Sequence, residues 1–162
     1  MQIKLCNNEK GIYVFQLDQN NYIKFCPHRG GVITNWVSNG HEILYFDEKR
    51  FMDKTKSIRG GIPILFPICG NLNISNSIFG KDYLRLMQHG FARDMKWQYY
   101  FNKKEKSLGL FLNESEITQK YYPFKFKVNI EISLEINFLK FKINIHNKTN
   151  TKMPFNFGLH PY

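Results

Sequence analysis

The chain has 162 residues, so we treat residues 1–162 as a single domain that is large enough to bury a hydrophobic core. Hydrophobic residues make up 43% and aromatic residues 16%, which excludes a disordered chain, and no apolar run is long enough to span a membrane. The net charge of +10 does not predict a nucleic-acid partner, because only five of the 23 basic residues are arginine and the lysines are scattered.

The first half of the sequence predicts short strands separated by turns. Residues 12–17 and 22–26 flank a cluster of turn-forming residues and predict a β-hairpin. Residues 32–37 and 42–46 follow as two further strands. From 47 to 95 the sequence has no clear period and is interrupted by glycine and proline. Because a long irregular segment inside a compact domain is usually functional, we expect the ligand-facing loops there.

The second half contains the clearest periodic signal. From residue 124 to residue 135 apolar side chains occupy the even positions and polar ones the odd positions, which indicates a strand with one buried face. From 139 to 146 the apolar residues occupy odd positions, so we expect a tight reversal near Asn137 between two antiparallel strands. Shorter strands are predicted at 96–101, 108–113 and 153–159. The fold class is therefore all-β, with a large antiparallel sandwich.

The termini and the cysteines bear on the environment of the protein. Residues 1–10 have no apolar segment of the kind found in secretory signals, so we expect a cytoplasmic protein that does not bind membranes. The three cysteines, an odd number without C-x-x-C spacing, predict neither a disulfide framework nor a cysteine zinc site.

Two of the five histidines lie in short motifs that can carry chemistry. His89 lies in the sequence QHGFAR and His160 in the sequence GLHPY. As alternatives, His89 is a buried histidine that braces a loop through its ring nitrogens, and His160 is a strand-end residue before a proline. We expect structural or surface roles for the remaining three, His28, His41 and His146.

Arg59 and Arg93 stand out because this chain uses lysine for most of its positive charges. One interpretation is a structural ion pair with an acid such as Asp53 or Asp94. The other is a clamp on a phosphate or carboxylate, since a planar guanidinium can donate two parallel hydrogen bonds. The adjacent residues 60–61, both glycine, would let backbone amides approach such an anion closely.

Five motifs occur together and in a fixed order along the chain. They are PHRGG at 27–31, RGGIPILFP at 59–67, QHGFAR at 88–93, Trp97, and GLHPY at 158–162. With these motifs the sequence resembles the aldose 1-epimerase (galactose mutarotase-like) superfamily, and within it the hexose-6-phosphate mutarotase (glucose-6-phosphate 1-epimerase) branch. The resemblance implies a β-supersandwich. It also implies an isomerase that interconverts the α and β anomers of a sugar phosphate without cofactor or metal.

The resemblance also implies roles for individual residues. His160 corresponds to the general acid that protonates the ring oxygen, a step that suits a group titrating near neutral pH. Arg59, Gln88 and Arg93 correspond to substrate-binding residues, with both arginines expected on the phosphate. His89 corresponds to a second active-site histidine that contacts the sugar.

In the family that the chain resembles, the general-base glutamate and a further substrate-binding aspartate lie downstream of the GLHPY motif. We therefore expect an N-terminal portion of a C-terminally incomplete domain, with impaired catalysis, or one half that a second chain completes. Glu131 and Glu135 match no catalytic position of the family. The alternative is a non-catalytic remnant that binds carbohydrate or sugar phosphate, and a basic nucleic-acid-binding β domain ranks last.

Overall fold

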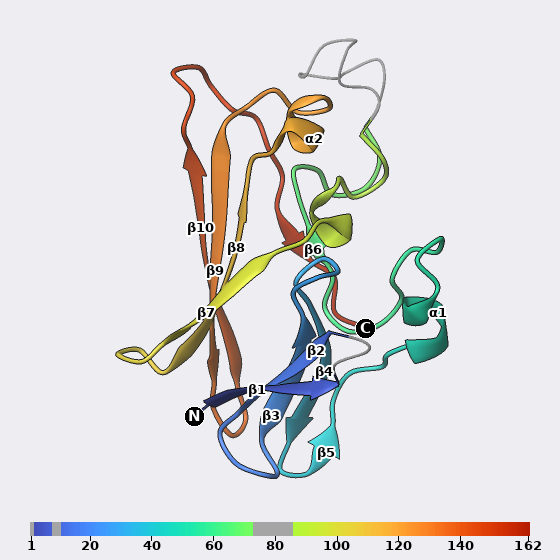
Figure 1. Ribbon diagram of the computed structural model, residues 1–162, viewed down its shortest axis with the longest axis vertical. Coiled ribbons are helices and arrows are strands. Elements are labelled where there is room, and N and C mark those ends of the chain that lie inside the picture. The colour runs from blue at the N-terminus through green and yellow to red at the C-terminus, as the bar shows by residue number, and fades with distance from the viewer. Residues whose placement is uncertain (1, 8–10, 73–85) are drawn as a thin grey trace.

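The computed structural model describes residues 2–7, 11–72 and 86–162, and within them it confirms the all-β class. Five consecutive strands form an antiparallel meander in the order β1-β2-β3-β4-β5 (Figure 1). These strands are β1 (Gln2–Asn7), β2 (Ile12–Gln16), β3 (Tyr22–Cys26), β4 (Val32–Ser38) and β5 (His41–Glu42). The hairpin expected at 12–26 is therefore present as β2 and β3.

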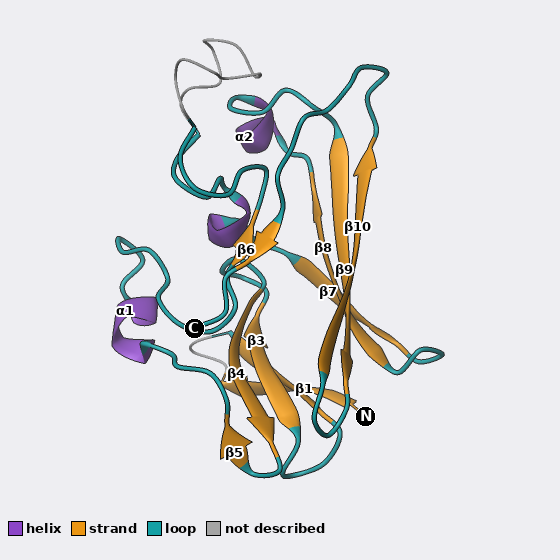
Figure 2. Cartoon of the chain, turned by 180° about the vertical axis from the view of Figure 1, so that it is seen from behind, coloured by secondary structure: helices purple, strands orange, loops and turns teal. Residues whose placement is uncertain are grey.

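A second antiparallel sheet has the order β10-β9-β8-β7 and crosses the first (Figures 1 and 2). Its strands are β7 (Gln98–Asn102), β8 (Ser107–Asn113), β9 (Phe126–Leu134) and β10 (Leu139–Asn147). Buried and partly exposed residues alternate along β9, as the sequence pattern predicts. Reciprocal backbone hydrogen bonds between Glu135 and Phe138 close the reversal, which confirms the expected turn around Asn137.

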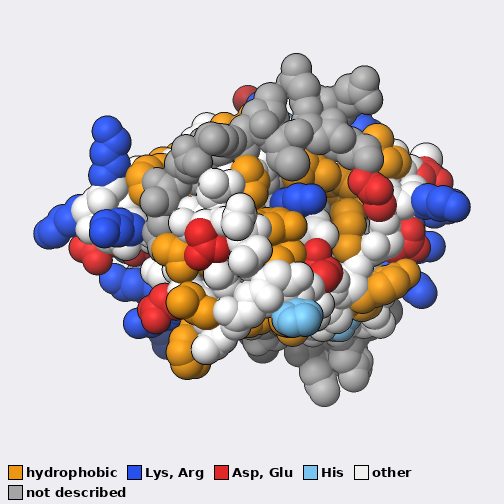
Figure 3. Space-filling view, turned by 90° about the horizontal axis from the view of Figure 1, so that it is seen from below, with side chains coloured by type: hydrophobic (Ala, Val, Ile, Leu, Met, Phe, Trp, Pro, Cys, Tyr) orange, Lys and Arg blue, Asp and Glu red, His pale blue; other side chains and the backbone are white. Residues whose placement is uncertain are grey.

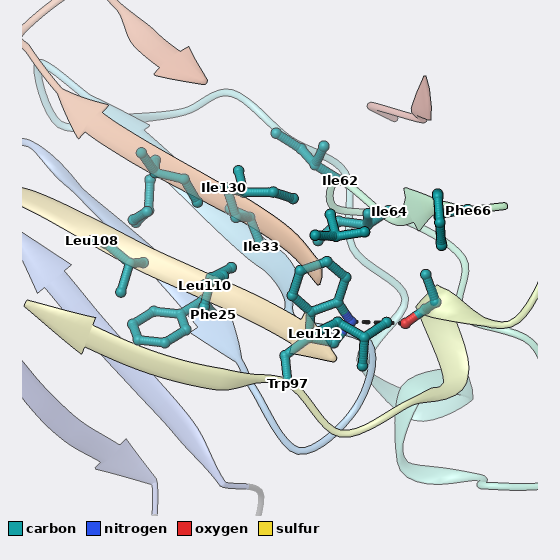
Figure 4. Close-up of a cluster of buried hydrophobic side chains, with 14 of the residues drawn as sticks. Phe25, Ile33, Ile62, Ile64, Phe66, Trp97, Leu108, Leu110, Leu112 and Ile130 are labelled. Carbon is teal, nitrogen blue, oxygen red and sulfur yellow. Dashed lines mark hydrogen bonds between the residues drawn. The ribbon is translucent and has the colours of Figure 1, made fainter. Parts of the chain in front are cut away.

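The main hydrophobic core lies between the two sheets and draws side chains from both of them. Phe25 and Ile33 from the first sheet pack in the same cluster as Leu110 and Ile130 from the second (Figure 4). Trp97 is 1% exposed within this cluster, and its indole Nε1–H donates to the backbone carbonyl of Ala92 at 2.9 Å (Figure 4). Burial of one continuous apolar cluster explains why the two sheets form one unit.

The segment from 47 to 95 is mostly irregular in its described part, as expected. It contains only α1 (Glu48–Met52), β6 (Ile64–Leu65) and a 3-10 helix, η3 (Ala92–Asp94). Two further short elements in the described part of the chain are α2 (Glu116–Gln119) and β11 (Gly158–Leu159), and β11 pairs with β6. None of the helices in these described ranges is long and apolar enough to cross a bilayer.

Two predicted strands are shorter in the structure. The strand expected at 42–46 stops at Glu42: the Ile43 N–H still donates to Trp36 O in β4 at 2.8 Å, but Phe46 forms an isolated bridge with Gly60. The strand expected at 153–159 is reduced to β11, and Pro154 near its expected start has no N–H to donate to a ladder.

Basic and acidic side chains both lie on one face of the molecule. On the face shown in Figure 3, lysine and arginine side chains lie at both edges of the view, with acidic side chains between them.

Candidate functional site

The end of the chain lies antiparallel to the segment that follows Arg59. In β11 and β6, Gly158 pairs with Leu65 and Leu159 pairs with Ile64. The pairing continues beyond the strands, where the His160 N–H donates to Pro63 O at 3.0 Å. Tyr162 extends it, with its N–H on Gly61 O at 3.1 Å and its carbonyl accepting from Tyr45 N–H at 3.2 Å. The motifs GLHPY and RGGIPILFP are thus brought side by side, and Figure 1 shows the C-terminal residues passing β6 toward the segment with α1.

The QHGFAR motif is fixed to the same segment from another side. Phe66 O accepts hydrogen bonds from both Phe91 N–H (3.0 Å) and Ala92 N–H (3.1 Å). Gly90 has a φ of +73°, and a Cβ at this position would lie 2.3 Å from Phe66 O. Only glycine fits such a close approach in this backbone conformation.

His89 is held on both its backbone and its ring by one residue, Gly70. The His89 N–H donates to Gly70 O at 2.8 Å, and the Gly70 N–H donates to His89 Nδ1 at 2.9 Å. Because Nδ1 accepts a hydrogen bond, the proton of the neutral ring resides on Nε2. One ring nitrogen therefore braces the loop, as the structural alternative predicts, and the other remains a hydrogen-bond donor.

The rings of His89 and His160 form a stacked pair. Their centroids are 5.9 Å apart with an interplanar angle of 28°. Burial lowers the pKa of His89 below its ordinary value of 6.5, and the positive charges of Arg93 and His160 lower that pKa further. His89 is consequently held neutral near pH 7. On its other side, His160 meets the ring of Tyr162 edge to face, at a centroid distance of 4.7 Å.

Arg93 lies close enough to His89 to affect its pKa, and it is fixed to its own loop. Its Nη2 donates to the backbone carbonyl of Gln88 at 2.8 Å, while the Gln88 residue itself is exposed. The expected ion pair with Asp94 is long, with 3.7 Å between Nε and Oδ2. The Arg93 side chain is only 14% exposed, and its Nε is buried without a hydrogen-bond partner in the described ranges.

Arg59 differs from Arg93 because it is exposed and forms no ion pair within the part of the chain that the structure describes. Asp53, the alternative partner, instead forms an ion pair with Lys56, with 3.0 Å between Oδ2 and Nζ. Hydrogen bonds from Thr55 and Lys56 lower the pKa of Asp53 to about 2. Only the backbone of Arg59 is anchored, by Asp47 N–H on its carbonyl at 3.1 Å. Its guanidinium is therefore free to meet a ligand.

The expectation that both amides of residues 60–61 approach an anion is wrong for one of them. The Gly61 N–H donates to Tyr45 O at 2.7 Å and is already used by the protein. The reason is the bridge between Phe46 and Gly60, which draws this stretch into strand-like pairing.

Other candidates lie outside this group. His28, His41 and His146 are exposed. No group of three or more histidine, cysteine or acidic residues within 2–7, 11–72 and 86–162 could hold a metal ion. The sequence reasoning missed Gly70 as the residue that orients His89, although its position in a glycine-rich segment was a signal. It also missed the packing of Tyr162 on His160, whose only signal was its place in the motif.

The comparisons with known proteins agree on one family. The family model described as aldose 1-epimerase matches residues 13–162. Over 145 residues the chain is 30% identical to a protein of Cenchrus ciliaris provisionally named glucose-6-phosphate 1-epimerase, covering 82% of this chain and 41% of that protein.

Solved structures are similar over nearly the whole chain. The crystal structure of the Slr1438 protein from Synechocystis sp. PCC 6803 is 41% identical with a TM-score of 0.85, covering 93% of this chain and 53% of that one. A galactose mutarotase related enzyme from Lactobacillus acidophilus is 29% identical with a TM-score of 0.75. The match covers 93% of this chain and 48% of that enzyme. The chain thus spans about half the length of its relatives. The fold is galactose mutarotase-like, and the chain belongs to the aldose 1-epimerase family.

Proposed function

We propose that this chain carries the general-acid and phosphate-binding part of a hexose-6-phosphate mutarotase, which interconverts the α and β anomers of a sugar phosphate. The observation that carries the proposal is the stacked pair of His89 and His160, whose ring centroids are 5.9 Å apart. Arg93 lies beside this pair. We propose that the two rings bind the sugar between them. The name of the Cenchrus ciliaris relative supports the same substrate class.

In this proposal each histidine has one task. Ring opening requires a proton on the ring oxygen, and His160 donates it as the general acid. His89 is kept neutral, with Nδ1 occupied by Gly70, so its Nε2–H donates a hydrogen bond to a sugar oxygen. Arg59 and Arg93 hold the phosphate, and Gln88 binds a hydroxyl of the sugar. No cofactor or metal takes part in this proton transfer.

The opposite proton transfer needs a base that takes the proton of the anomeric hydroxyl. Within the pair, His89 is unsuited to this task, since its unprotonated nitrogen already accepts the Gly70 N–H. We propose that further polypeptide, from a longer form of this chain or from a second chain, supplies the base. Loss of one of two acid–base partners typically costs about 10²–10⁴-fold in rate, so the 162 residues alone have impaired catalysis.

The second candidate is a site that binds a sugar phosphate without turning it over. It is favoured by the same observation on His89, because the one unprotonated nitrogen of that ring already accepts the Gly70 N–H. We propose a cytoplasmic location for either function.

The test is the exchange rate between the anomers of glucose 6-phosphate, measured by NMR saturation transfer with the 162-residue chain. Acceleration that is lost in His160→Ala supports the enzyme. Binding of glucose 6-phosphate without acceleration selects the second candidate. Equal exchange rates with and without the folded chain, together with no binding, would overturn both.

A further inference from the structure

The loop at 27–31 contacts two segments of the site. One carries Arg93, and the other leads to Arg59. On one side it meets the segment with Arg93: the Gly30 N–H donates to Met95 O at 2.8 Å, and Trp97 N–H donates to Pro27 O at 2.8 Å. Gly30 has a φ of +74°, and a Cβ there would lie 2.1 Å from Arg93 O. The loop is therefore in direct backbone contact with the residue that bears the Arg93 guanidinium.

On its other side the same loop reaches the segment before Arg59 through the side chain of Arg29. Arg29 Nη2 donates to Lys56 O at 2.7 Å and to Asp53 O at 3.2 Å. The guanidinium carbon lies 4.9 Å from the centroid of the Phe51 ring in α1. A planar guanidinium can stack and bind two carbonyls at once, whereas a lysine ammonium offers a compact point charge without a stacking face.

These contacts fix the backbone path of the segment that leads to Arg59. Asp53 and Lys56 are tied by Arg29, and Arg50 Nε donates to Ser57 O at 2.9 Å. The next anchor is the Arg59 carbonyl itself, which accepts from Asp47 N–H at 3.1 Å. Since the Arg59 side chain has no partner of its own in the described part of the chain, its location depends on this backbone path.

The charge of Arg29 also acts on the segment with Arg93. Burial raises the pKa of the neighbouring Asp94 carboxyl, and the positive charges of Arg93 and Arg29 partly oppose that rise. The charge of Arg29 therefore acts on the acid that lies 3.7 Å from Arg93 Nε.

We infer that Arg29 is a positioning residue that sets the separation of the Arg59 and Arg93 guanidiniums, and thereby the preference of the site for a phosphorylated over a free hexose. The inference rests on the proposed function. Its physical basis is that two cations can clamp one phosphate only when they lie at a fixed separation. In enzymes, a misplacement of about 1 Å can cost about 10²-fold in reaction rate. Arg29 is also one of the five arginines of a chain that uses lysine for most of its positive charges.

The test compares the affinities of the 162-residue chain for glucose 6-phosphate and for glucose, measured by NMR titration. The variants are Arg29→Lys, which keeps the charge, and Arg29→Met, which keeps the apolar stem. Both should weaken glucose 6-phosphate binding about tenfold and leave glucose binding within about twofold, because only the phosphate needs both arginines. Lys142→Met, which removes an exposed charge on β10, is the matched control and should change neither affinity.

The outcomes separate this inference from the proposed function. If the native chain does not prefer glucose 6-phosphate over glucose, the proposed function fails and the inference fails with it. If the native chain has the preference and Arg29→Lys keeps it, Arg29 has only a structural role and the inference alone is wrong. If Arg29→Met does not fold, Arg29→Lys decides. The Nε–Hε signal of Arg59 should respond to glucose 6-phosphate in the native chain and lose that response in Arg29→Lys.

Discussion

The hairpin of β9 and β10 and the site-bearing segments at 59–70 and 88–95 are built in opposite ways. In the hairpin, nine consecutive residue pairs follow one register, from Leu139 with Leu134 to Asn147 with Phe126. In the site segments, single backbone groups do the positioning: Phe66 O accepts two N–H groups, and the N–H and carbonyl of Gly70 both bind His89. The hairpin distributes its stabilisation over many similar contacts, whereas each site residue depends on one or two specific ones.

The difference predicts two kinds of response to mutation. A change in the hairpin core should lower the free energy of unfolding and leave the site unaltered until the chain unfolds. A change at one site anchor should displace His89, Arg93 or Arg59 at a smaller cost in stability. The following variants are ordered from the largest expected effect to the smallest.

Truncation in the sheet core should have the largest effect. Ile130 is 0% exposed in β9, so Ile130→Ala removes buried apolar atoms and leaves a cavity, at an expected cost of about 2–5 kcal/mol. Urea unfolding gives the free energy, and the NMR signals of His89 and His160 should stay in place. Lys140→Ala, on exposed β10, is the control and should cost within about 0.5 kcal/mol. Displaced histidine signals in folded Ile130→Ala would contradict the separation of the two regions.

Adding one methyl group at Gly90 tests a single anchor. Gly90→Ala combines a positive φ with a Cβ 2.3 Å from Phe66 O, and should cost about 1–3 kcal/mol. It should also abolish glucose 6-phosphate binding, since His89 and Arg93 flank the glycine. Gly40→Ala is the matched control: its φ is +80°, but the nearest atom to its Cβ, in Asn20, lies 4.0 Å away. The control should lose stability and keep binding, and equal effects of both changes would show that the close approach is unimportant.

Removing one buried hydrogen bond should have a moderate effect. Trp97→Phe removes the indole N–H from Ala92 O, which keeps the Met95 N–H at 3.4 Å, so the lost hydrogen bond should cost about 0.5–1.5 kcal/mol. Trp36→Phe provides the comparison, because Trp36 Nε1 is buried without a hydrogen-bond partner in the described ranges and loses no bond. Thermal unfolding of the two variants measures the difference. If Trp36→Phe lowers the thermal stability as much as Trp97→Phe does, both effects come from the lost ring volume and not from the hydrogen bond.

The pH dependence of stability should show the smallest effect. The pKa of His89 is lower in the folded chain than its ordinary value of 6.5, so the unfolded chain binds the proton more readily. The free energy of unfolding should therefore fall as the pH decreases from 6.5 toward the folded pKa. His89→Asn tolerates the positive φ of 69° and removes the titrating ring, so its stability should fall less between pH 7 and pH 5. Parallel pH profiles for the native chain and the variant would disprove this contribution.

The sequence by itself determined the elements that a local pattern encodes. The alternation from 124 to 146 predicted β9, β10 and their reversal, and the turn cluster at 18–21 predicted the hairpin of β2 and β3. The motifs also predicted the chemical composition of the site, because QHGFAR, RGG and GLHPY are contiguous stretches. These features depend on neighbours in sequence, and so they can be read from it.

The tertiary structure alone decided which of these residues meet. The stacking of His89 on His160, the bond of Gly70 to His89 Nδ1, and the use of the Gly61 amide by Tyr45 all join residues distant in sequence. The bridge between Phe46 and Gly60, which follows the end of β5 at Glu42, also joins distant residues. The hydrogen bond from Arg29 to Lys56 O in the loop before Arg59 does the same. Hydrogen-bond donors and acceptors in an irregular segment have many potential partners of equal chemistry. Only the packing of the two sheets, which fixes the distances between those segments, selects one.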